Sequence, residues 1–111
     1  MIMMEVYIEE ATSYLFEGPS DTDQFAHLIL QLINMKSNDS SIIEVRTYYG
    51  TDEIKVVQLI DNATYSPVDL VKSYGGRIIH EDPIYVASVS QDDLYYELGD
   101  DDNVEEYYIG R

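Results

Sequence analysis

The sequence predicts an α+β fold in one domain, residues 1–111, with a small antiparallel sheet and helices on one of its faces. Runs of β-branched and aromatic residues, typical of strands, alternate with two segments that carry helical caps or helical apolar spacing. Glycine and proline separate these runs, as at Gly18-Pro19 and Gly75-Gly76. A chain of 111 residues is long enough to bury one modest core, and it has no cysteine to form disulfides.

The N-terminal part predicts a strand followed by the clearest helix of the chain. Residues 2–8 (IMMEVYI) are strand-like, and residues 9–16 either extend this strand or form a turn of helix. The helix begins at Ser20, which forms a capping pattern with Asp23, and it ends at the polar run 37–41. Its apolar residues recur at helical spacing: Phe25, Leu28, Ile29, Leu32 and Ile33.

The middle of the chain predicts a hairpin and a short second helix. Residues 42–49 and 53–60 are β-branched runs joined by a short loop that contains Gly50. In the second run the charged Lys55 alternates with apolar residues, which predicts that one face of this strand contacts water. Residues 66–74 (SPVDLVKSY) predict a helix with the serine as N-cap and the proline in the first turn.

The C-terminal part predicts two strands, a third helix and a last strand. Residues 77–80 and 84–90 are strand-like, and Pro83 between them predicts a bend or an edge. Residues 91–98 predict a short helix, and residues 104–109 predict the last strand. The order of the first six elements resembles the split βαβ, or ferredoxin-like, arrangement followed by a C-terminal extension.

Charge is the most unusual property of the composition. The chain has 22 acidic and 6 basic residues, a formal net charge of −16 at pH 7. A field of this sign repels nucleic acids and anionic membranes and attracts basic protein surfaces. No apolar run approaches the about 18 residues that a membrane span needs, and the start MIMMEVYIEE lacks the basic residues of a signal peptide. We therefore expect a cytoplasmic protein that binds neither nucleic acid nor membrane.

The acidic excess is largest in the C-terminal part, residues 81–111. This part holds 10 acidic residues and 1 basic residue, net −9, whereas residues 1–80 hold 12 and 5, net −7. Like charges held close together on a folded surface repel, so their concentration predicts a surface that binds a basic partner. The predicted partner-binding residues are Asp92, Asp93, Tyr95, Tyr96, Glu97, Asp100, Asp101, Asp102, Glu105, Glu106, Tyr107 and Tyr108.

The two tyrosine pairs within this acidic part have two interpretations. Tyrosine buries a large area and stacks against arginine, which suits an anchor in a basic protein channel. Ordinary strand packing, with one ring of each pair pointing in and the other out, explains the same pairs equally well.

In size, charge, lack of cysteine and mixture of carboxylates with tyrosines, the chain resembles the small acidic anti-defence proteins of phages and mobile elements. These include DNA-mimic antirestriction proteins and anti-CRISPR proteins. The resemblance implies a non-enzymatic inhibitor that blocks the basic DNA- or RNA-binding channel of a nuclease, CRISPR effector or restriction enzyme. Acids on one face of a strand lie about 7 Å apart. This is comparable with phosphate separations along a nucleic-acid strand, where B-DNA carries about one charge per 3.4 Å of helix axis on each strand. A phage-encoded protein of this class would act in the host cell cytoplasm.

Two alternative functions stay open at this point. An immunity protein that neutralises a nuclease toxin would use the same acidic surface. A small metal-dependent enzyme would combine acids with a lysine and a histidine: Asp39, Asp52, Glu53, Lys55 and His80. The acids at 100–106 lack the glycine and the final bidentate acid of a calcium loop, and no phosphate-loop, dinucleotide or esterase motif occurs. We therefore expect no enzymatic activity, cofactor or metal.

A partner of a second kind is another copy of the chain. An exposed strand edge would allow two copies to pair as a homodimer. Repulsion between two chains of this net charge opposes such pairing at low salt.

Overall fold

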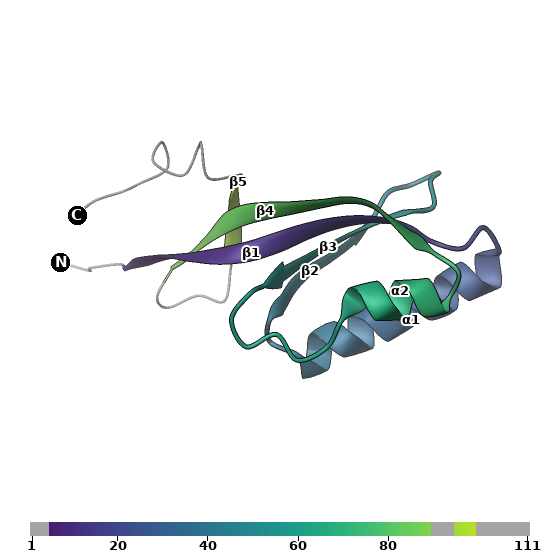
Figure 1. The fold of residues 1–111 in the computed structure, drawn as a ribbon, viewed down its shortest axis with the longest axis horizontal. Coiled ribbons are helices and arrows are strands. Elements are labelled where there is room, and N and C mark those ends of the chain that lie inside the picture. The colour runs from purple at the N-terminus through teal and green to yellow at the C-terminus, as the bar shows by residue number, and fades with distance from the viewer. Residues whose placement is uncertain (1–4, 90–94, 100–111) are drawn as a thin grey trace.

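The computed structural model describes residues 5–89 and 95–99, which form an antiparallel sheet and two helices (Figure 1). The elements in chain order are β1 (Val6–Glu17), α1 (Thr22–Asn38), β2 (Ile42–Thr47), β3 (Glu53–Leu59), α2 (Pro67–Ser73), β4 (Arg77–Val89) and β5 (Tyr95–Gly99). Both helices cover the same face of the sheet (Figure 1). The predicted α+β class with helices on one face is therefore confirmed.

The sheet has the strand order β2-β3-β1-β4-β5, and every pair of neighbours is antiparallel. Helix α1 connects β1 to β2 across β3, and helix α2 connects β3 to β4 across β1. Each strand–helix–strand unit thus has a strand of the other unit inserted into it, as in the split βαβ arrangement. Strand β5 extends this sheet at the edge of β4.

The helix caps follow the predicted chemistry, with one shift in position. The N-cap of α1 is Asp21 and not Ser20, and its carboxylate accepts a hydrogen bond of 2.9 Å from the N–H of Gln24. The sequence offers the same three-residue spacing at both positions, and aspartate is as good a cap as serine. Helix α2 begins as predicted, because the Ser66 hydroxyl accepts a hydrogen bond from the N–H of Asp69.

The helices and the sheet enclose one apolar cluster between them. Its buried members come from both helices and three strands: Phe16, Leu28, Leu32, Ile42, Ile54, Val56 and Val71. Tyr14 packs at its margin and stacks on Phe16, with ring centroids 5.4 Å apart. Each fully buried side chain of this size stabilises the fold by roughly 1.5–3 kcal/mol, so this cluster accounts for much of the stability.

A second apolar cluster lies on the opposite face of the sheet. It contains Ala11, Val57, Leu59, Ile84 and Val86, with Tyr95 packed against it. The prediction that one face of β3 contacts water is therefore wrong for Val57 and Leu59, which are buried, whereas Glu53 and Lys55 on the same face are partly exposed. The sheet curls and covers that face with β4 and β5, and register shifts between its strands, which mark β-bulges, increase the local twist that allows this.

The C-terminal strands differ from the prediction in two ways. Strand β4 is continuous, because Pro83 pairs with Thr12 inside it and does not interrupt it. Strand β5 pairs with residues 85–88 of β4, so within the described residues no strand lies beside Pro83 on the outer edge of β4 to require its missing N–H. The helix predicted at 91–98 is wrong over residues 95–98, which belong to β5. Residues 90–94 and the strand predicted at 104–109 lie outside the described residues.

A buried carboxylate fixes the loop between β3 and α2. Asp39 is 3% exposed and accepts hydrogen bonds from the Ser41 hydroxyl and N–H and from the N–H groups of Thr64 and Tyr65. Gln58 completes the network by donating to the Ser41 hydroxyl and to the Tyr65 carbonyl. Burial raises the pKa of Asp39, but the four hydrogen bonds outweigh it, so that the pKa lies below its ordinary value of 3.8.

Candidate partner-binding surface

Strand β5 carries three residues of the predicted acidic surface, and two of these side chains attach the strand to the rest of the sheet. Tyr95 packs against the second apolar cluster, which belongs to β1, β3 and β4. The Glu97 carboxylate accepts a hydrogen bond of 2.6 Å from Lys55 of β3, although β1 and β4 separate these two strands in the sheet. The curl of the sheet brings them together, so β5 is held at two points beyond its backbone pairing with β4.

Lys55 is the cation on which this contact depends. Its ammonium group lies 2.6 Å from Glu97 and 3.8 Å from Oε1 of Glu44, and the side chain is only 19% exposed. Oε1 of Glu44 is buried and accepts no hydrogen bond within the described residues. Lys55 therefore balances two carboxylates in a half-buried setting, where ion pairs are screened less by salt than they are on an open surface.

Replacing Lys55 with methionine is expected to loosen β5. The substitution keeps the aliphatic stem but leaves the Glu44 and Glu97 carboxylates without their cation, at a cost of about 1–2 kcal/mol. In hydrogen-exchange measurements we expect the amide protons of β5 to exchange faster in the variant than in the wild type, while the exchange of β1 and β3 changes little. Lys72→Met is the matched control, since Lys72 is exposed and forms no ion pair within the described residues. Equal exchange in both variants would show that Lys55 does not hold β5.

The structure describes three of the twelve predicted partner-binding residues. Tyr95 is half-buried, and Tyr96 is 54% exposed in a row with Ala87 and Ile8 across β5, β4 and β1. This pair therefore has one ring inward and one outward, as the strand-packing interpretation expects. Glu97 is exposed but paired with Lys55, so part of its charge is neutralised. The other nine lie outside the described residues: Asp92, Asp93, Asp100, Asp101, Asp102, Glu105, Glu106, Tyr107 and Tyr108.

A second group of acids, which the sequence did not single out, lies on the paired strands β1 and β4. We call Glu9, Glu10, Glu81 and Asp82 the acidic ladder. Around residues 6–10 and 85–89 these two strands run side by side beyond the helices (Figure 1). No lysine or arginine occurs between residues 5 and 17 or between 78 and 89, a signal in the sequence that could have pointed to this group.

The register of the two strands spaces the ladder evenly. Glu81 pairs with Tyr14 and Asp82 with Ser13, so each lies four residues from the ladder acid of β1 that shares its face, Glu10 or Glu9. At about 3.4 Å per residue, the two carboxylates on each face are about 13–14 Å apart along the strands.

Neighbouring glutamates contribute to the raised pKa values of two tyrosines on β1. The Tyr7 hydroxyl donates a hydrogen bond to Glu5, and this bond together with the glutamate charge raises the pKa of Tyr7. Partial burial, followed by the negative charge of Glu81, raises the pKa of Tyr14.

The residues of the metal-enzyme alternative do not form a site. Asp39 is buried, and both of its carboxylate oxygens accept hydrogen bonds within its own network. Lys55 is engaged by Glu44 and Glu97, while His80 is exposed in β4. Across residues 5–89 and 95–99, no three histidine, aspartate or glutamate side chains are grouped so that they could hold a metal ion.

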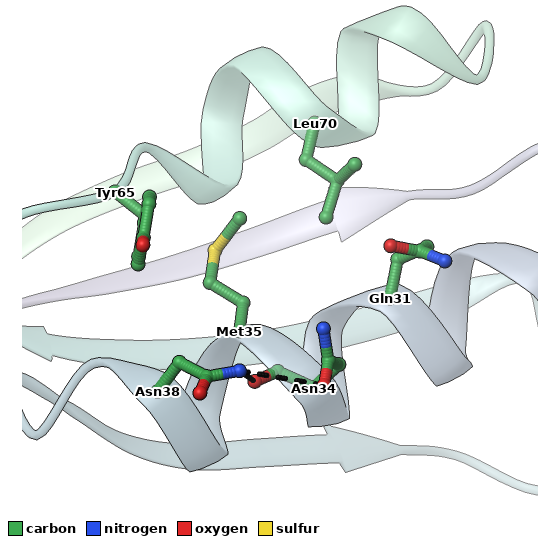
Figure 2. A pocket seen from close by; sticks show the side chains of 6 residues that line it. All are labelled: Gln31, Asn34, Met35, Asn38, Tyr65 and Leu70. Atoms are coloured by element: carbon green, nitrogen blue, oxygen red, sulfur yellow. Dashed lines mark hydrogen bonds between the residues drawn. The ribbon is translucent and has the colours of Figure 1, made fainter.

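A shallow pocket of about 260 Å³ lies between the two helices and Tyr65 (Figure 2). Helix α1 lines it with Gln31, Asn34 and Asn38, and the Asn38 amide donates a hydrogen bond of 2.9 Å to the Asn34 carbonyl. Met35 and Leu70 face each other across it (Figure 2). No charged side chain lines this pocket, so it is not part of the acidic surface.

No known protein family, curated protein or solved structure matches the chain. Neither helix within the described residues is long and apolar enough to cross a membrane. The function must therefore be argued from the acidic surface itself.

Proposed function

We propose that the chain is an acidic inhibitor that mimics nucleic acid and blocks the basic DNA- or RNA-binding channel of a nuclease, CRISPR effector or restriction enzyme. One observation carries this proposal: the carboxylates of the ladder are presented on paired strands without lysine or arginine to neutralise them. Glu9, Glu10, Glu81 and Asp82 form no ion pair within the described residues. The partner is therefore a basic nucleic-acid-binding protein, and nucleic acid and membrane are excluded as direct ligands by charge.

Within the described residues, the lysine and arginine side chains that form ion pairs do so with acids outside the ladder. Arg77 pairs with Glu17 and Arg46 pairs with Glu44. Lys55 pairs with both Glu44 and Glu97. A lysine or arginine of a partner would thus meet ladder carboxylates that have no internal competitor. Repulsion between these carboxylates lowers the stability of the fold, and the binding of a basic surface relieves this repulsion.

Two paired strands suit this role because they hold the carboxylates in fixed positions. A spacing of about 13–14 Å along each face corresponds to about four phosphates along one strand of B-DNA. The ladder alone is therefore sparser than nucleic acid. In the proposal, the predicted acids Asp100 to Glu106 add further carboxylates to those of the ladder.

Exposed apolar groups beside the ladder provide the part of binding that is insensitive to salt. Tyr96 is 54% exposed, and Ile8, in the same cross-strand row, is 38% exposed. A tyrosine ring can stack on an arginine of the partner, which adds affinity that pure charge attraction does not supply. If the chain is phage-encoded, this binding takes place in the host cell cytoplasm.

Capture from a lysate of the host tests the proposal. The immobilised chain is exposed to lysate at low salt and washed with rising salt, and the released proteins are identified. We expect a nucleic-acid enzyme that binds at low salt and is released before about 0.5 M, where the Debye length falls to a few ångströms. A partner that stays bound above that concentration, or one with no nucleic-acid channel, would refute the proposal.

A further inference from the structure

Strand β2 leaves one edge of the sheet open. It is the last strand of the order and pairs only with β3 within the described residues. Its register shift lies between Ile42 and Glu44, which leaves residues 44–47 in regular pairing with β3. The outer side of this regular segment carries backbone groups that another strand can bind.

The flank of α1 beside this edge is apolar and exposed. Leu30 is 64% exposed and Ile33 is 48% exposed, the largest exposures among the aliphatic residues of the helix. Lys36, one turn after Ile33, lines a cavity with Ile43 and Glu44, which places this flank next to β2. Tyr95 and Glu97 of β5 line the same cavity. The opposite flank of α1, with Gln31 and Asn34, faces α2 instead.

The sequence of this side also carries no net charge. Residues 24–51, which include most of α1 and all of β2, hold 2 acidic and 2 basic residues. The remaining sequence holds 20 acidic and 4 basic residues. Two copies of a chain with net charge −16 therefore repel each other less through this side than through the acidic ladder.

The charges of β2 are complementary to themselves under a two-fold axis. In an antiparallel pair of two β2 strands centred on Val45, Glu44 of each strand lies opposite Arg46 of the other. Within one chain these two side chains are already close, with Arg46 Nη2 3.5 Å from Glu44 Oε2. Lys55 lies 3.8 Å from the other oxygen of Glu44, so the pairing across the axis would place a third cation beside this carboxylate.

We propose that two copies of the chain associate through the open edge of β2 and the Leu30–Ile33 flank of α1. The two sheets then continue into each other across the two-fold axis, and Leu30 and Ile33 of the two helices cover one another. A basic partner is a poor fit to this neutral side, since it would bind the acidic ladder in preference. The dimer is independent of the proposed inhibitor function, and it leaves both ladders outside the interface.

Sedimentation velocity over a range of protein and salt concentrations tests the dimer. We expect a monomer–dimer equilibrium that shifts toward dimer as salt screens the repulsion between the two chains. Capture of a basic partner is expected to respond to salt in the opposite direction, so failure of one proposal is distinguishable from failure of the other. A wild-type chain that is monomeric at every concentration and salt, or that forms larger assemblies, would overturn the inference.

Two substitutions locate the interface, and a third is their control. Ile33→Glu and Arg46→Glu are each expected to weaken the dimer at least about tenfold, by placing an acid in the apolar contact or opposite Glu44. Ile8→Glu adds one negative charge to another exposed isoleucine and is expected to change the dimer less than about threefold, the residual effect of added net charge. Thermal unfolding shows whether each variant is folded. A dimer that survives both interface substitutions, or that Ile8→Glu weakens equally, would contradict this interface.

Discussion

Replacing Asp39 with alanine is expected to lower the free energy of unfolding by about 3–4 kcal/mol. The substitution removes the acceptor for one hydroxyl and three N–H groups, of Ser41, Thr64 and Tyr65, in a site where the carboxylate is 3% exposed. A buried donor that loses its partner costs about 1–3 kcal/mol, and water entering the site recovers part of the total. Chemical denaturation of the variant and the wild type measures the difference.

The same residue predicts how stability depends on pH. The pKa of Asp39 in the folded protein lies below its ordinary value of 3.8, so the unfolded chain binds a proton more readily than the folded chain. The stabilisation is therefore complete above about pH 4–5 and is lost as the pH falls through the folded pKa. The stability of Asp39→Ala should not show this part of the decrease at low pH.

Asp61→Ala is the matched control, because Asp61 is an exposed aspartate in the loop that Asp39 fixes. We expect its effect on the free energy of unfolding to stay within about 0.5 kcal/mol. If Asp39→Ala were equally mild, the network of Asp39, Ser41 and Gln58 would not be a source of stability.

Neutralising four acids of the ladder is expected to weaken binding to the captured partner by about 30-fold or more. The variant carries Glu9→Gln, Glu10→Gln, Glu81→Gln and Asp82→Asn. An exposed charge pair contributes about 0.5 kcal/mol, and four of them make about 2 kcal/mol, close to a 30-fold change in the dissociation constant. Titration calorimetry with the purified partner measures it.

A variant with the same net charge separates placement from total charge. It carries asparagine at four exposed aspartates outside the ladder: Asp23, Asp52, Asp61 and Asp69. We expect this variant to lose less than about fivefold in affinity, because distant exposed charges are screened at physiological salt. Equal losses in the two variants would mean that net charge, and not the ladder, drives the binding.

The sequence predicts most elements of the fold because local signals and tertiary contacts agree there. Phe25, Leu28 and Leu32 have helical spacing and face the core, and Ser66 caps α2 as its chemistry requires. The prediction fails where a distant strand decides the structure. The sequence predicts a short helix over residues 91–98, yet Tyr95 and Glu97 belong to a strand held by β4 and Lys55.

The candidate surface is predictable only in part, for a similar reason. The sequence shows the acids after Glu81 because they are consecutive along the chain. The ladder joins Glu9 and Glu10 to Glu81 and Asp82, about 70 residues later, through the β1–β4 register. Likewise, the pairing of Lys55 with Glu97 depends on the curl of the sheet, which no local pattern encodes.

Competition between the chain and DNA for the captured enzyme tests nucleic-acid mimicry most directly. Labelled duplex or single-stranded DNA is bound to the enzyme, and the chain is added in increasing amounts while the bound label is followed. The account predicts complete displacement of the DNA, with the ladder-neutralised variant requiring about 30-fold more protein to achieve it. A ternary complex of enzyme, DNA and chain, with the label still bound at saturation, would contradict the account.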